Sequence, residues 1–328
     1  MARGDLSGKI LKLFREQPAG FVSGALLSRE LGVTRAAIWK QVERLRQRGY
    51  QIEAVSSKGY QLLETPDLFV ADELAADLGN TRIGRQLVCF EDTDSTNVQA
   101  RRLAEEGCAD GTVVIADRQT AGRGRLGRGW VSPAGVNFYG SIVLRPPIPA
   151  VEASQLTFLS AVATREAIAA CGALLPTMKW PNDILLLGRK VAGLLNELDA
   201  ETERVNFVIL GIGVNLNMTA DQFPADLRYP ATSVLLETGT PVLRLTFARR
   251  LLQRLDHWYQ HYLQDGFEPV LRAWEEGCDL VGSEVEVDCR GILRRGTVTG
   301  LDSDGALLLR TAASPRERIL AGDVRRLS

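Results

Sequence analysis

The stretch GRGRLGRGW, residues 122 to 130, combines four glycines with three arginines, a composition suited to binding an anion. Guanidinium groups bind carboxylates and phosphates through paired hydrogen bonds. Glycines allow backbone N–H groups to come close to a ligand. We therefore expect this loop to hold a carboxylate, a phosphate or both. A solvated basic loop without a ligand remains the alternative when the stretch is taken alone.

Three well-known glycine-rich loops do not fit this stretch. Residues 122 to 127 match G-x-G-x-x-G, but residues 130 to 135 (WVSPAG) break a helix and the next acidic residue is Glu152, so a dinucleotide fold is not indicated. A P-loop would need Lys-Ser/Thr where the chain has Arg128-Gly129. A kinase loop needs the motifs H-R-D and D-F-G, which the sequence lacks.

Four more polar strings lie farther along the chain, and each has a simple structural explanation of its own. DSTN can cap a helix, KWPND suits a turn before a strand, and RKVAG suits a hairpin turn. In GIGVN, glycines beside an asparagine allow backbone to approach a ligand. Separately each signal is weak. The strings occupy residues 94–97, 179–183, 189–193 and 211–215.

Regular elements must position these strings. Strands are predicted over residues 112–117 and 137–144, on either side of the arginine loop, and the short turns between later strands indicate a mixed or antiparallel sheet, because parallel strands need long crossovers. The other predicted elements are helices over 98–106, 153–171 and 243–265, and strands over 184–187, 191–198 and 205–217.

Composition limits the class of protein. With 328 residues, 45% of them apolar, the chain has room for two or three domains with packed cores. Residues 1–60 hold eleven basic and five acidic residues, a net charge of +6, which leaves −7 for the remainder because the whole chain carries −1. This asymmetry suggests nucleic-acid contact at the N-terminal segment.

The cysteines and the hydropathy pattern indicate a soluble cytoplasmic protein. Five widely spaced cysteines without a C-x-x-C motif predict neither a disulfide framework nor a zinc site. No apolar stretch approaches the ~20 residues of a membrane span, and no signal-peptide core is present.

The N-terminal segment has the pattern of a winged helix-turn-helix. Ser23 can cap a helix that ends at Gly32, and Thr34 can cap a second helix over residues 35–48 with a basic outer face that includes Arg48. Strands over 50–55 and 60–63 would form the wing. A helical bundle with an ordinary charged surface is the alternative. The predicted DNA-binding residues are Ser23, Thr34, Arg35, Trp39, Lys40, Arg44 and Lys58.

The C-terminal part predicts a small β-barrel, since alternating segments at 284–287, 296–301, 306–310 and 318–321 are separated by Gly and Asp. In the preceding helix, His257 and His261 stand four residues apart and could hold zinc from one helix face. No Glu follows the first histidine as a zinc protease requires, so a surface or packing role is favoured.

Together, and in this order, the strings resemble the bacterial biotin protein ligases of the bifunctional kind, which also repress the biotin operon. The similarity rests on DSTN, on GRGR with Arg128 and Trp130, and on KWPND, RKVAG and GIGVN, and it runs nearly end to end. It implies an α+β protein of three domains. These are a winged helix-turn-helix at 1–65, a mixed-sheet α/β biotin/lipoate ligase-like catalytic domain at 66–277, and an SH3-like β-barrel at 278–328.

The resemblance implies a reaction of two steps. Biotin's carboxylate attacks the α-phosphate of ATP to give biotinyl-5'-AMP, and a lysine of a biotin carboxyl carrier protein then takes the biotin. Catalysis is expected from Lys190, Arg125 and Arg123. Biotin would be bound by Ser95, Thr96, Asn97, Gln119, Gly122, Arg123, Gly124, Arg125, Trp130, Lys190 and Gly193. The nucleotide would be bound by Arg123, Arg125, Arg128, Trp130, Lys179, Asn182, Lys190 and Asn215.

The resemblance also implies ATP, Mg²⁺ and biotin as ligands, with biotinyl-AMP as corepressor. No direct protein ligand for Mg²⁺ is assigned, although Asp183 would support the ion indirectly. Residues 218–232, including Phe223, Pro224 and Thr232, would cover the adenine, whose stacking residues stay unassigned. Leu126 and Gly129 depart from the family, which often has basic residues there.

Further expectations concern partners and movement. Partners are the carrier protein, operator DNA and a second copy of the chain once the adenylate is bound, with no membrane. The loop 118–136 is expected to be disordered without ligand and to close over the adenylate, which shields the anhydride from water. A lipoate-type ligase and a biotin-sensing regulator without turnover are the alternatives.

Overall fold

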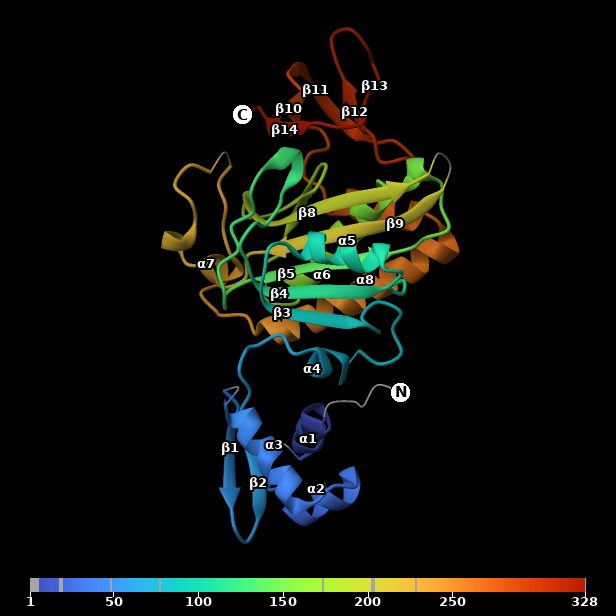
Figure 1. Ribbon diagram of the computed structural model, residues 1–328. Coiled ribbons are helices and arrows are strands. Elements are labelled where there is room, and N and C mark those ends of the chain that lie inside the picture. Colours follow the sequence, from blue (N-terminus) through green and yellow to red (C-terminus); the bar gives the residue numbers. More distant parts are fainter. Residues whose placement is uncertain are drawn as a thin grey trace. The chain divides into compact units, whose positions relative to one another are not determined.

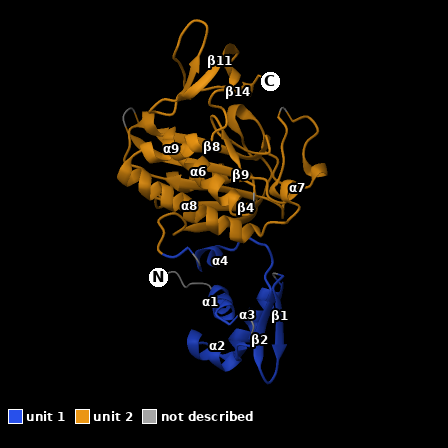
Figure 2. Ribbon diagram, turned by 180° about the vertical axis from the view of Figure 1, so that it is seen from behind, with its two compact units in different colours: residues 1–79 blue, residues 80–328 orange. Residues whose placement is uncertain are grey.

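The computed structural model describes residues 6–17, 20–47, 49–76, 78–172, 174–201, 204–227 and 229–327. The chain falls into two compact units, Met1–Gly79 and Asn80–Ser328 (Figure 2). Arg48, expected on the basic face of the N-terminal unit, lies outside the described residues.

The N-terminal unit is a winged helix-turn-helix, as the sequence predicted. Its core is formed by apolar side chains of the first three helices, among them Ile10, Leu27 and Ile38, each fully buried. Two antiparallel strands form the wing. The elements are α1 (Leu6–Arg15), α2 (Gly24–Leu31), α3 (Arg35–Gln47), β1 (Gln51–Val55), β2 (Gly59–Glu64) and α4 (Ala71–Ala76).

Capping residues set the turn between α2 and α3. The Ser23 hydroxyl accepts the Leu26 N–H at 3.1 Å, and Gly32 ends α2 in the left-handed conformation with φ 65°. The Thr34 hydroxyl accepts the Ala37 N–H at 3.2 Å and starts α3. Gly32 and Thr34 therefore define the helix ends on the two sides of the turn, and Ser23 defines the start of α2.

A seven-stranded mixed sheet forms the centre of the second unit, with the order β3-β4-β5-β9-β8-β7-β6 (Figure 1). Only β3 and β4 pair in parallel, joined through a helix, and every other neighbouring pair is antiparallel. The strands are β3 (Leu87–Thr93), β4 (Thr112–Gln119), β5 (Phe138–Leu144), β6 (Thr177–Lys179), β7 (Asp183–Leu186), β8 (Arg189–Ala200) and β9 (Val205–Val214).

Helices cover both faces of this sheet. The helix α5 (Thr96–Glu105) lies on one face, and α6 (Gln155–Ala169), α8 (Arg244–Asp265) and α9 (Glu268–Glu276) lie on the other (Figures 1 and 2). The short helix α7 (Val234–Thr238) follows the last central strand. Most residues of α6 are buried between the sheet and α8, which explains why its apolar side chains are not confined to one face. In the described part of the chain, no helix is both long and apolar enough to span a membrane.

The C-terminal segment forms an antiparallel sheet of order β13-β12-β11-β10-β14. It is fixed to the central domain by the buried Trp180, whose indole N–H donates to the Gly305 carbonyl at 3.1 Å. Gly305 fits because an added Cβ would lie 2.6 Å from the Phe158 ring. The strands are β10 (Glu284–Cys289), β11 (Ile292–Leu301), β12 (Leu307–Arg310), β13 (Glu317–Ile319) and β14 (Asp323–Arg326).

Most predicted elements are present, with shifted ends. The strand expected over 205–217 ends at Val214, because the following residues turn to form the site. Strand β8 already begins at Arg189, which the sequence assigned to a turn. The elements α4, α7, α9, β3, β6 and β14 were not predicted. The fold class itself, an N-terminal helix-turn-helix, a mixed-sheet centre and a β-rich C-terminal domain, is confirmed.

Candidate active site

The arginine loop between β4 and β5 folds into a closed hairpin. Gly124 N–H donates to the Arg128 carbonyl at 2.7 Å, and Trp130 N–H donates to the Gly122 carbonyl at 2.9 Å. Gly122 is required there, since an added Cβ would lie 2.3 Å from the Trp130 oxygen. The turn passes through Leu126 with φ 56° and Gly127 with φ 72°. The backbone thus presents Arg125 and Arg128 from a defined turn.

Trp130 lies on a platform made of two glycines. Gly193 of β8 and Gly213 of β9 are paired in the sheet, and an added Cβ on either would lie within 2.9 Å of the indole. The Lys190 ammonium lies 5.4 Å from the indole centroid. The indole N–H is buried and has no acceptor among the described residues. Glycines of the RKVAG and GIGVN strings therefore serve to seat the tryptophan.

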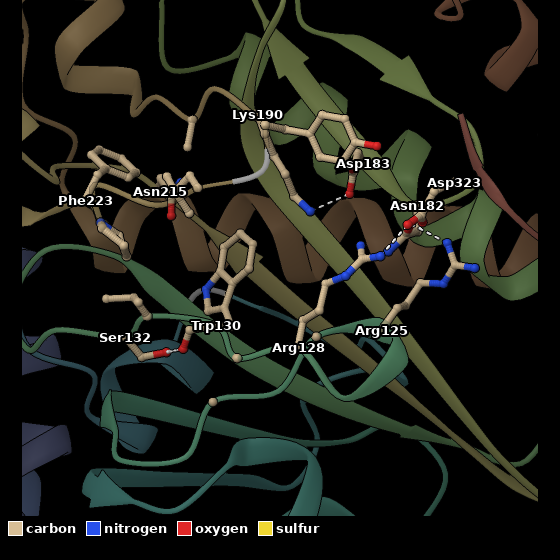
Figure 3. Close-up of a pocket in the computed structure, with 18 of the residues that line it drawn as sticks. Arg125, Arg128, Trp130, Ser132, Asn182, Asp183, Lys190, Asn215, Phe223 and Asp323 are labelled. Atoms are coloured by element: carbon tan, nitrogen blue, oxygen red, sulfur yellow. Dashed lines mark hydrogen bonds and ion pairs between the residues drawn. The ribbon is translucent and has the colours of Figure 1, made fainter. Parts of the chain in front are cut away.

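Four cations gather beside this tryptophan, and each has a partner. Figure 3 shows three of them, Arg125, Arg128 and Lys190. The Lys190 Nζ lies 2.6 Å from Asp183 Oδ1. Arg125 donates to Asn182 Oδ1 at 2.9 Å, and Arg128 pairs with Asp323 of β14. The Lys179 Nζ lies 4.4 Å from the Tyr229 ring centroid.

Burial makes some of these charges costly. It lowers the pKa of the Arg125 guanidinium and the pKa of the Lys179 ammonium below their ordinary values. Hydrogen bonding to Asp323 instead raises the pKa of Arg128. An incoming anion would pair with Arg125 and Lys179 and so offset the free-energy cost of burying their charges. This makes the cluster well suited to binding an anion.

A second, mostly uncharged cluster lies at the start of α5. Thr96 N–H donates to Gln119 Oε1 at 2.8 Å, and the Ser141 hydroxyl donates to Asn97 Oδ1 at 2.6 Å. Asn97 also donates to Glu197 at 2.9 Å. Ser95 is in the cap position, yet its side chain makes no capping hydrogen bond. Simple helix capping thus does not account for Ser95, which is only 2% exposed.

Two adjoining cavities bring the predicted ligase residues together. A cavity of about 880 Å³ is lined by the cations, and one of about 50 Å³ lies beside the start of α5. Trp130 and Lys190 border both. Of the predicted residues, those that line only the larger cavity are Gly122, Arg128, Lys179, Asp183 and Asn215. Those that line only the smaller cavity are Ser95, Thr96, Asn97, Arg123 and Gly193. Those that line both cavities are Gln119, Gly124, Arg125, Trp130, Asn182 and Lys190.

The segment after β9 closes the larger cavity and is tied to Lys190 through the backbone. Lys190 N–H donates to the Pro230 carbonyl and Thr232 N–H donates to the Lys190 carbonyl, each at 2.9 Å. The Asn215 amide donates to the Thr232 carbonyl at 3.0 Å. Phe223 and Pro224 line the cavity, whereas Thr232 is fully buried in the scaffold.

Sequence reasoning missed several residues of the site. Asp323 and Tyr229 line the larger cavity, and Ser141 and Glu197 complete the polar cluster of the smaller one. None of them belongs to a recognisable string. Their only signal was polarity at a strand position or near a chain end, which is common on surfaces.

The predicted DNA-binding residues lie on the N-terminal unit. Arg35, Lys40, Arg44 and the 58% exposed Trp39 occupy the outer side of α3. Ser23 and Thr34 are helix caps, as described above. Lys58 lies in the wing, with its Nζ 5.4 Å from the Phe21 ring centroid.

The histidine pair of α8 is a surface feature. The rings of His257 and His261 are 4.5 Å apart, and His261 Nδ1 lies 2.9 Å from Asp265 Oδ2. Among the described residues there is no group of three or more His, Cys, Asp or Glu side chains that could hold a metal ion.

Comparisons with known proteins agree with this organisation. Residues 89–215 match the biotin/lipoate A/B protein ligase family, residues 8–61 match the HTH domain, and residues 281–326 match the biotin protein ligase C terminal domain. The chain is 38% identical to the bifunctional ligase/repressor BirA of Bacillus spizizenii, over 94% of this chain and 95% of that protein. The chain belongs to the bifunctional ligase/repressor family. The Escherichia coli member is 33% identical over 88% of each chain.

A solved ligase has the same catalytic fold. The biotin protein ligase from Aquifex aeolicus, in complex with biotin and ATP, superposes with a TM-score of 0.64 at 29% identity, covering 74% of this chain and all of that one. Membership in the ligase/repressor family confirms the resemblance found in the sequence.

Proposed function

We propose that the chain is an ATP-dependent biotin protein ligase and a biotin-responsive repressor. The observation that carries this proposal is the pair of adjoining cavities, one polar and one cationic, with Lys190 and Trp130 at their junction. The ring of biotin is neutral and its carboxylate is charged, so the vitamin matches this division. Binding of biotin and ATP by the Aquifex aeolicus relative supports the same assignment.

In the first step, the biotin carboxylate oxygen forms a bond to the α-phosphorus while pyrophosphate leaves. Two anions must approach each other, which costs several kcal/mol at ~4 Å where water is partly excluded. Lys190 and Arg125 border both cavities and would neutralise this repulsion, with Arg123 on the biotin side and Arg128 and Lys179 on the phosphates. Lys190 would act as the principal electrophile.

Binding of the vitamin would use the smaller cavity. Ser95, Thr96, Asn97 and Gln119 offer hydrogen bonds to the ureido group, and Gly193 lets the ring lie close to the sheet. A cavity of about 50 Å³ is far below the roughly 300 Å³ at the lower end of ordinary ligand pockets, so other side chains of the arginine loop would move outward to admit biotin while Trp130 stays on its two glycines. Its unpaired indole N–H is then available to the ligand.

In the second step, the amine of a carrier-protein lysine attacks the acyl carbon of biotinyl-AMP, and AMP leaves with the bonding pair. The loop 118–136 and the segment 218–232 would cover the adenylate and exclude water. We propose that this closure accompanies ligand binding, with Asn182 and Asn215 holding their loops in place through the hydrogen bonds described above.

The oxygen donors lining the larger cavity fit a Mg²⁺ ion that is bound mainly by the nucleotide phosphates. Such sites use one or two carboxylates together with substrate phosphates, and Asp183 lines the larger cavity while paired with Lys190. Asp183 would hold the ion indirectly. The bound ion would supply additional neutralisation of phosphate charge.

We further propose that residues 1–65 bind operator DNA, that 66–277 carry the ligase reaction, and that 278–328 complete the enzyme. The basic outer side of α3 and the net charge of +6 over residues 1–60 support DNA contact. The adenylate would promote homodimerisation and so act as corepressor. Five widely spaced cysteines without a C-x-x-C motif support a cytoplasmic location.

One assay tests the ligase proposal against its alternatives. The chain is incubated with ATP, Mg²⁺, labelled biotin and an apo carrier domain, and both pyrophosphate and protein-bound label are measured. Biotinylation supports the proposal; label transfer from lipoate alone would indicate a lipoate ligase; biotin binding without pyrophosphate would indicate a regulator without turnover. A gel-shift titration with and without biotin and ATP tests the repressor part, which ligand-independent binding to all DNA probes would contradict.

A further inference from the structure

Strand β14 of the C-terminal domain brings one carboxylate into the cationic cavity. Asp323, its first residue, lines this cavity together with Lys179 and with Arg125 and Arg128, which Figure 3 shows beside it. Its carboxylate pairs with Arg128, and the side chains are 12% and 43% exposed respectively. An acid in this place needs an explanation, because a cavity suited to a polyphosphate gains nothing from a negative charge.

The position of Asp323 is fixed by the scaffold, whereas Arg128 extends from a loop. Asp323 pairs with Asp288 in the ladder between β14 and β10. The C-terminal domain is in turn held by the Trp180–Gly305 hydrogen bond and by the bond from Leu301 N–H to Glu275 Oε1 at 3.3 Å. The carboxylate therefore stays in place if the arginine side chain turns to another anion.

The charges around Asp323 show what it does in the absence of a ligand. Its hydrogen bond raises the pKa of Arg128, and its negative charge opposes the effect of burial on the pKa of Arg125. It thus supplies part of the negative charge that nucleotide phosphates would otherwise bring. A phosphate that binds Arg128 must compete with this carboxylate and is repelled by it.

We propose that Asp323 is a resident counter-anion, which holds Arg128 in the empty site, gives it up to the nucleotide phosphates and takes it back when pyrophosphate leaves. The inference rests on the proposed ATP-dependent function. Asp323 is a positioning residue that tunes nucleotide affinity. The C-terminal domain would thereby take part in the nucleotide step through a single side chain.

Equilibrium titration of the full chain with Mg²⁺ and α,β-methylene-ATP tests this proposal without turnover. Asp323→Asn should bind the analogue about threefold to tenfold more tightly, because both the competing pair and its repulsion are lost. Pyrophosphate should also inhibit adenylate formation more strongly. A purely structural role would instead weaken binding of the analogue, so unchanged or weaker binding overturns the proposal.

Three variants sharpen the result. Glu286→Gln removes a carboxylate of the same domain that pairs with Arg295 and Arg325 outside the cavity, and should leave analogue binding unchanged. Asp323→Glu keeps the charge and should restore the affinity to near the wild-type value. In an Arg128→Ala background, Asp323→Asn should have a smaller effect, and an undiminished effect there would refute action through Arg128.

The outcomes also separate this inference from the proposed function. A wild-type chain that does not bind the analogue overturns both. A wild-type chain that binds it as tightly as Asp323→Asn, with both proteins folded by circular dichroism, overturns only the role of Asp323.

Discussion

Replacing Gly213 by alanine should push Trp130 off the sheet and weaken biotin binding. The added Cβ would lie 2.6 Å from the indole Nε1 and 2.7 Å from Cε2. Non-bonded heavy atoms settle at about 3.5–4.0 Å, so the indole must move by about 1 Å. Gly193, its partner on β8, lies against the same ring, since an added Cβ there would be 2.9 Å from it, so a shift of the indole also disturbs this second contact.

The effect on binding should be much larger than the effect on stability. Gly213 is not among the glycines with positive φ, so alanine fits its backbone conformation. A misplacement of about 1 Å in a preorganised site can cost about 100-fold, and we expect the biotin Kd to rise by about tenfold to 100-fold. Trp130 lies in a loop and can shift without opening the core.

Calorimetric titration with biotin, beside a thermal melt, provides the assay. Gly129→Ala is the matched control, because Gly129 lies in the same loop and an added Cβ would meet nothing within 4 Å. Biotin affinity of Gly213→Ala within about twofold of wild type would show that the seat of Trp130 does not govern vitamin binding.

Three further changes have defined outcomes. Lys190→Met should reduce pyrophosphate formation by about 100-fold to 1000-fold with an unchanged thermal midpoint, as a group that neutralises developing charge would; a small loss would remove Lys190 from the chemistry. Trp180→Phe should lower the free energy of unfolding by about 1–3 kcal/mol in a urea titration, because the Gly305 carbonyl loses its donor; an unchanged midpoint would show that water replaces the indole. Burial lowers the pKa of Lys179, so its ammonium loses its proton at a lower pH than an ordinary lysine. Binding of α,β-methylene-ATP should therefore weaken as the pH rises toward 10, and Lys179→Arg should flatten this dependence; a profile that Lys179→Arg leaves unchanged would assign the titration to another group.

The residues that could be predicted are those whose type is dictated by their immediate surroundings, such as a glycine where there is no space for a side chain. Gly122 and Gly213 must be glycine because backbone or indole occupies the space of a side chain, and the arginines between them mark an anion. Requirements of this kind are visible in short stretches of sequence. The ligase residues expected from those stretches all line the two cavities. Helix caps at Ser23 and Thr34 were equally local.

Features that depend on contacts between residues far apart in the sequence could not be predicted. Asp323 lies 195 residues after its partner Arg128, and its neighbourhood is rich in charged residues that pair at the surface. Strand β3 is parallel to β4 and ends in acidic residues, so its sequence lacks the continuous apolar run of a buried strand. Strand ends moved for a similar reason, since the residues after Val214 are held by loops from elsewhere in the fold.

The contact between Phe158 and Gly305 limits which C-terminal domains of related ligases could replace the one in this chain. Any side chain at position 305 would meet the aromatic ring at 2.6 Å, and its φ of 87° also disfavours other residues. A chimera that carries the last strands of another ligase would therefore assemble only if the donor turn is glycine or the recipient ring is trimmed. Phe158 of the central domain and Gly305 of the C-terminal domain therefore have to change together, so the C-terminal domain cannot be exchanged independently of the central domain.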